Sequence, residues 1–83
     1  MPTVSERVKT VTAKILKLDP KDISDTADFV RDLGAESLQS IELVAAFEEE
    51  FGIEMNEDEA LQVKTIDKAV SFISKVMAAQ GKA

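Results

Sequence analysis

Apolar residues recur every three or four positions in three stretches of this chain, which is the spacing of one face of an α-helix. The stretches end before Asp19-Pro20, at Gly52 and before Gly81, at residues typical of helix ends. Residues 18–36 have no such period and are rich in turn formers. The pattern predicts an all-α fold, a small four-helix bundle with three long helices, one short helix and a long first loop. We expect a single domain over residues 1–83.

Several predicted helix ends carry capping residues. Thr3 followed by Glu6 matches a capping box, so the first helix is expected from Thr3 to about Lys17. Asn56 is a good N-cap for a short acidic helix, and Thr65 is expected to cap the last one. The stripe of the first helix comprises Val4, Val8, Val11, Ile15 and Leu18. The residues expected to hold the long loop against the core are Ile23, Phe29, Val30 and Leu33.

Residues 37–51 carry the strongest helical pattern. Their expected core face comprises Leu43, Val44, Phe47 and Phe51. Ile41 and Ala45 lie beside this face, so the apolar width exceeds what one core contact needs. This helix is therefore either central in the bundle or uses part of the width for docking. The stripe expected for the last helix comprises Ile66, Ala69, Val70, Ile73, Val76 and Met77.

The acidic residues are concentrated in one part of the chain. Ten acids and no Lys or Arg lie between Asp32 and Val63, whereas the other residues include six acids and ten bases. A field of this sign attracts basic protein surfaces and repels phosphate backbones, so no nucleic acid partner is expected. A solvated face that only aids solubility is the alternative. No apolar run is long enough for a membrane span or a signal peptide, and a cytoplasmic monomer is expected.

The chain has no Cys and no His. Their absence excludes disulfides, thiolate ligands and the usual general base near neutral pH. The acids between residues 19 and 28 lack the central Gly and final Glu of a calcium-binding loop, so no metal site is expected. A self-contained enzyme is therefore not expected.

Ser37 stands where the long loop meets the second helix. The unpaired N–H groups and the positive dipole end of a helix start stabilise a phosphate ester on such a serine. The alternative is that Ser37 is simply an N-cap. Nucleophilic catalysis is not expected, because the chain has no His and no Lys lies near Ser37 in the sequence.

The chain contains FVRDLGAESL at 29–38, IEL at 41–43 and FEEEF at 47–51. In this order and spacing the stretches resemble acyl carrier proteins, and the resemblance covers almost the whole chain. It implies that Ser37 receives 4′-phosphopantetheine from coenzyme A through a phosphopantetheinyl transferase. The arm's thiol would then hold acyl groups as thioesters. The implied function is that of a carrier between enzymes of fatty-acid, polyketide or specialised lipid biosynthesis, with no catalytic residues of its own.

The resemblance also implies two further sets of residues. Those expected to dock onto basic patches of acyl-transferring and chain-elongating enzymes are Glu36, Leu38, Ile41, Glu42, Ala45, Glu48 and Glu49. Those expected to line a space for the acyl chain are Phe29, Leu43, Phe47, Met55, Ala60, Val63 and Ala69. Ordinary core packing is the alternative for the second set.

Some positions depart from the family pattern. Glu36 replaces the usual Asp, while Gln39 and Arg31 stand where acids are common. The surface near Ser37 is therefore less negative, and our hypothesis is a specialised carrier with few partners. Phe47 stands where a smaller aliphatic residue is common, and a shortened or redirected acyl pocket is a second hypothesis. An aminoacyl or peptidyl carrier and an unloaded acidic helical adaptor are the alternative functions.

Overall fold

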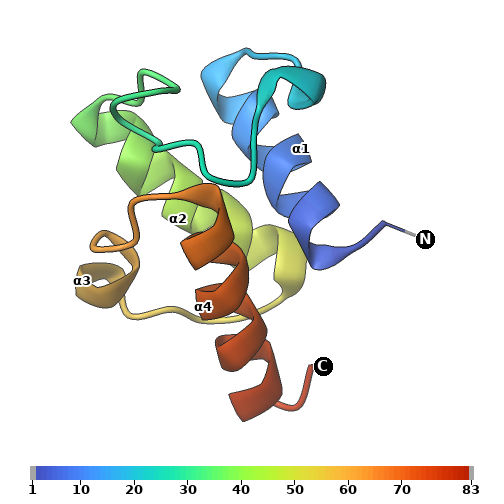
Figure 1. Cartoon of the computed structure of the whole chain (residues 1–83). Coiled ribbons are helices and arrows are strands. Elements are labelled where there is room, and N and C mark those ends of the chain that lie inside the picture. The colour runs from blue at the N-terminus through green and yellow to red at the C-terminus, as the bar shows by residue number, and fades with distance from the viewer. Residues whose placement is uncertain (1, 83) are drawn as a thin grey trace.

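The computed structural model describes residues 2–82, and within them it contains helices and no strand (Figure 1). The elements in chain order are α1 (Val4–Leu16), the 3₁₀-helix η1 (Pro20–Asp22), α2 (Ser37–Phe51), α3 (Glu57–Ala60) and α4 (Ile66–Ala79). The predicted all-α bundle with three long helices and one short one is confirmed. The 3₁₀-helix η1 lies within the long first loop that the sequence predicts. Pro20 at the first position of η1 favours this helical turn.

The capping box of α1 is confirmed. The Thr3 hydroxyl accepts a hydrogen bond from the Glu6 N–H, and the Glu6 carboxylate accepts one from the Thr3 N–H. α1 ends where Lys17 adopts a left-handed conformation with a φ of 59°. This residue turns the chain off the helix, so Leu18 lies outside the stripe and is 39% exposed. The expectation that Leu18 belongs to that stripe was wrong.

The helix α2 supplies a large part of the core. The four predicted core residues Leu43, Val44, Phe47 and Phe51 are all buried. α2 ends at Gly52, whose φ of 63° suits a residue without a Cβ. Arg7 of α1 stacks over the Phe51 ring at 4.3 Å from its centroid and donates to the Glu50 carboxylate at 2.8 Å. Together these contacts join the start of α1 to the end of α2.

Backbone hydrogen bonds tie the long loop to the start of α4. The Phe29 N–H donates to the Lys64 carbonyl at 2.9 Å, and the Ile66 N–H donates to the Ala27 carbonyl at 3.0 Å. Within the loop Ile23 and Phe29 are buried, as expected. Leu33 packs against the core while only partly buried.

Val30 is 55% exposed, and its expected role in holding the loop against the core was wrong. The reason is local. The Asp28 carboxylate accepts hydrogen bonds from the N–H groups of Val30 and Arg31, and these bonds fold the backbone into a turn. Val30 is thereby left largely exposed, although part of it lines the cavity between the loop and the helices.

The helix α4 packs Ile66, Ala69 and Ile73 into the core. Thr65 is the N-cap residue of α4, as expected, but its hydroxyl makes no capping hydrogen bond and donates instead to the Asp67 carboxylate. Among residues 2–82 no helix is both long and apolar enough to cross a membrane.

Candidate functional site

Ser37 is the first residue of α2, and its side chain is exposed. The segment before it is anchored: Ala35 is buried, and its N–H donates to the Phe29 carbonyl at 2.8 Å. Gly34 allows the chain to approach this anchor with a φ of 73°. The loop thus delivers Ser37 to the surface at a fixed place.

Ser37 is not the N-cap of α2, so the simple cap interpretation is wrong. The N-cap is Glu36, and its N–H donates to the Gln39 side chain at 2.9 Å. Within residues 2–82, neither the Ser37 hydroxyl nor the N–H groups of Ser37 and Leu38 have a hydrogen-bond partner. A free hydroxyl beside free helix-start donors fits a phosphate ester, because the helix dipole and these donors stabilise the anion.

An exposed face of α2 runs away from Ser37. Leu38 is 68% exposed and Ile41 is 46% exposed. With Glu42, Ala45 and Glu49 they follow the three- and four-residue spacing of one helix face, and all five are exposed. We call these five residues the α2 face. It places apolar and acidic side chains side by side.

Two of the predicted docking residues lie apart from the α2 face. Glu36 is exposed but precedes the helix. Glu48 is partly buried, and its carboxylate accepts the Met55 N–H at 2.9 Å, so it holds the connection between α2 and α3.

A cavity of about 90 Å³ lies between the long loop, α2, α3 and α4. Every residue expected to line an acyl space lines this cavity: Phe29, Leu43, Phe47, Met55, Ala60, Val63 and Ala69. The wall also includes residues that the sequence analysis did not select: Val30, Ser40, Val44, Leu61, Lys64, Phe72 and Ile73.

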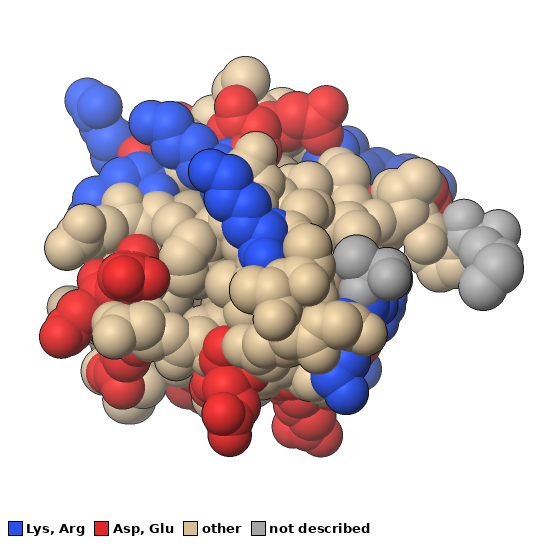
Figure 2. All heavy atoms as spheres, turned by 90° about the horizontal axis from the view of Figure 1, so that it is seen from below, with Lys and Arg blue, Asp and Glu red and all other residues tan. Residues whose placement is uncertain are grey.

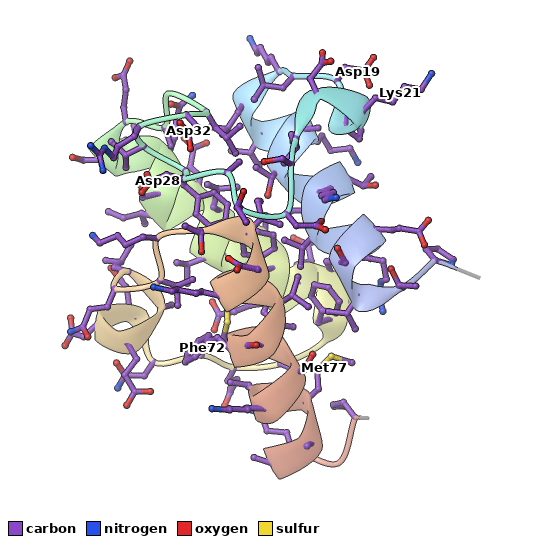
Figure 3. The ribbon with its side chains drawn as sticks, viewed as in Figure 1. Asp19, Lys21, Asp28, Asp32, Phe72 and Met77 are labelled. Carbon is purple, nitrogen blue, oxygen red and sulfur yellow. The ribbon has the colours of Figure 1, made fainter. Side chains whose placement is uncertain are left out.

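Phe72 is the largest side chain that the sequence analysis missed. Figure 3 shows it on the side of α4 that faces α3, away from Met77. The core stripe of α4 does not include it, but it lies three residues after Ala69 and so shares that residue's face. This spacing from a predicted lining residue is the signal that could have found it.

The row Ser37, Ser40 and Val44 links the start of α2 to the cavity. These residues are three and four positions apart and therefore lie along one side of α2. Ser40 and Val44 both line the cavity. A group on Ser37 consequently starts one helical turn from the cavity wall.

Two acidic side chains of the loop before Ser37, Asp28 and Asp32, bond to its backbone (Figure 3). The Asp32 carboxylate accepts the Asp28 N–H at 2.8 Å. Hydrogen bonds from the N–H groups of Arg31 and Val30, with the positive charges of Arg31 and Lys64, lower the pKa of Asp28 below its ordinary value. Within residues 2–82 no three acidic side chains are grouped closely enough to hold a metal ion.

Comparison with known proteins agrees with this geometry. The family model described as the phosphopantetheine attachment site matches residues 6–73. The chain is 46% identical over 78 residues to the acyl carrier protein of Sinorhizobium fredii (strain NBRC 101917 / NGR234). It is equally identical to the acyl carrier protein AcpP of Rhizobium meliloti (strain 1021), and both alignments cover 94% of this chain and the whole relative. The chain belongs to the acyl carrier protein family, whose cofactor is a covalently attached 4′-phosphopantetheine.

Proposed function

We propose that this chain carries acyl groups on a phosphopantetheine arm attached to Ser37. The observation that supports this most is the position of Ser37 at the start of α2, where its hydroxyl is exposed and has no hydrogen-bond partner among residues 2–82. A phosphodiester there would face the unbonded N–H groups and the positive end of the helix dipole. The arm supplies the thiol that the chain lacks, since the sequence has no Cys.

Attachment requires a base that this chain does not supply. In the proposed step the Ser37 oxygen forms a bond to phosphorus and gives its proton to a base, while the diphosphate bond of coenzyme A breaks and adenosine 3′,5′-bisphosphate leaves. No His occurs in the sequence, and the residues next to Ser37 are acidic or uncharged. A phosphopantetheinyl transferase would therefore provide the base, and this chain would present the hydroxyl.

The cavity gives the acyl chain a place out of water. Its seven predicted lining residues are apolar, and each methylene that moves from water to such surroundings contributes about 0.8 kcal/mol. Ser40 and Val44 lead from the side of Ser37 into this space. The proposed role of the seven residues is thus to shelter the cargo between visits to enzymes.

The α2 face is the proposed docking surface. Glu42 and Glu49 would meet Lys or Arg on the partner, and Leu38 with Ile41 would supply a small apolar contact. Contacts of this kind favour fast, salt-sensitive association, which a shuttle needs. The proposed partners are a phosphopantetheinyl transferase and enzymes of fatty-acid, polyketide or specialised lipid biosynthesis. The small partner set and the cytoplasmic monomer stay predictions.

Intact-protein mass spectrometry tests the proposal. The chain is incubated with coenzyme A and a broad-specificity phosphopantetheinyl transferase. We expect a mass gain of one phosphopantetheine, retained in the matched Ser40→Ala variant and absent in Ser37→Ala. Ser40 is a suitable control because it is the next serine on α2 and lies one turn away. If several transferases produced no gain in the unaltered chain, an adaptor that works by docking alone would replace the carrier.

A further inference from the structure

The cavity has a far end along α2. Counted from Ser37, the last α2 residue that lines it is Phe47, about 15 Å along the helix axis at 1.5 Å per residue. The next core residue of α2, Phe51, is buried but does not line the cavity. The space open to a chain that enters from the side of Ser37 therefore ends at Phe47.

Phe29, on the long loop, packs against Phe47 in the wall of the cavity. The Phe29 and Phe47 rings are 6.5 Å apart between centroids and tilted by 59°, a favourable aromatic arrangement. Both rings are buried, and both line the cavity. Phe29 is held further by its backbone bond to Lys64. The pair is thus a packed wall between two elements.

The cavity is small for a long chain. An apolar cavity of about 150 Å³ is known to bind benzene, which has six carbons. At the same cavity volume per carbon atom, the cavity of about 90 Å³ accommodates about four carbons. A longer chain must either displace the Phe29–Phe47 wall or leave its end in water.

We propose that the Phe29–Phe47 wall restricts the enclosed cargo to short acyl groups. Room for about four carbons holds a whole butyryl group, or the last four carbons of a hexanoyl group whose thioester carbonyl and adjacent carbon stay outside the cavity. This inference rests on the proposed function, since it assumes an acyl thioester on the Ser37 arm. Phe47 is then the residue that determines chain length. A smaller aliphatic side chain at this position would lengthen the enclosed space without changing attachment at Ser37.

The test uses the phosphopantetheine-loaded protein charged with saturated acyl groups from acetyl to palmitoyl. The melting temperature is measured for each, because filling an apolar cavity stabilises the folded state. For the unaltered chain we expect the melting temperature to rise up to hexanoyl and then to level off. In Phe47→Leu and in Phe29→Leu the rise should continue to octanoyl or beyond.

The matched control is Phe51→Leu, which removes the same atoms from the core of α2 outside the cavity. It should lower every melting temperature while the rise still ends at hexanoyl. A steady rise to palmitoyl in the unaltered chain would overturn the inference, and so would a limit unchanged in both cavity variants. The mass of each sample separates the two proposals. An unmodified Ser37 would contradict both the proposed function and this inference. Fully loaded samples whose melting temperatures show no limit at hexanoyl would contradict only this inference.

Discussion

At the residue scale, the loop before Ser37 depends on one carboxylate. Asp28 accepts hydrogen bonds from two backbone N–H groups, and its own N–H donates to Asp32. The Arg31 N–H bond is the largest cause of its lowered pKa. A group whose pKa is lowered on folding stabilises the fold above its unfolded value, and this contribution is lost as the pH falls through the folded pKa.

Asp28→Asn should therefore change the acid sensitivity of the fold. Asn keeps an acceptor but cannot ionise, so the variant should be less stable than the unaltered chain at neutral pH. The difference should shrink as the pH falls below 3.8, the ordinary Asp value. The urea midpoint measured across this range checks the prediction. A difference that stays constant with pH would show that the charge of Asp28 contributes nothing.

The sequence predicted the positions of single residues correctly where their neighbours along the chain determine those positions. It located Ser37 at the start of α2, and all seven residues chosen for the acyl space line one cavity. It failed for Val30, which was expected to hold the loop against the core but is exposed by the Asp28 turn. Phe72 was missed because it lies outside the core stripe of α4, although its spacing from Ala69 indicated the same face.

At the scale of elements, α3 depends on its cap. It spans only Glu57–Ala60 and has no buried residue, so its packing contributes little. The Asn56 side chain accepts the Glu59 N–H at 3.1 Å and satisfies one free donor of the helix start. Met55 and Ala60, at either side of this cap, line the cavity. The cap thus helps to hold one wall of the cavity.

Asn56→Ala should lower the free energy of unfolding by about 1 kcal/mol, the usual cost of a lost N-cap. Asn56→Asp should retain most of the stability, since a carboxylate at a helix start both accepts and complements the dipole. Urea unfolding monitored by circular dichroism measures both. Equal midpoints for Asn56→Ala and the unaltered chain would show that the cap bond is energetically unimportant.

Element boundaries set by local chemistry were predictable, and those set by distant pairing were not. The Thr3–Glu6 box, the Gly52 end of α2 and the Asn56 cap all operate within a few residues. The bonds from the long loop to the start of α4 join residues far apart in sequence. The helical periodicity of the sequence gives no signal for such a long-range pairing. In the same pairing, Thr65 forms an isolated β-bridge with Asp28.

At the scale of the whole molecule, charge is separated. The stretch without Lys or Arg between Asp32 and Val63 includes α2 and α3. In Figure 2 acidic side chains gather along the lower and left edges, with a further group at the top, while Lys and Arg lie mostly in the upper half. A partner with a basic patch would be steered toward the stretch that includes α2 and α3, because it carries ten acids and no Lys or Arg.

Charge removal on the α2 face should slow loading of Ser37. Glu42→Gln and Glu49→Gln should each reduce the rate at low salt by about two- to fivefold, the range for an exposed ion pair worth up to about 1 kcal/mol. High salt should remove the difference, because exposed charges are then screened. The control is Asp22→Asn, an exposed acid on η1. Equal slowing by all three variants, or slowing unaffected by salt, would contradict docking through this face.

Attachment of the cofactor to Ser37 can be tested by fragmentation mass spectrometry of the peptide containing residues 37–51, prepared from the loaded protein. We expect one phosphopantetheine, located on Ser37 and absent from Ser40. Attachment at Ser40 or at a serine outside this peptide would exclude Ser37 as the attachment site, and so would a protein that remains unmodified.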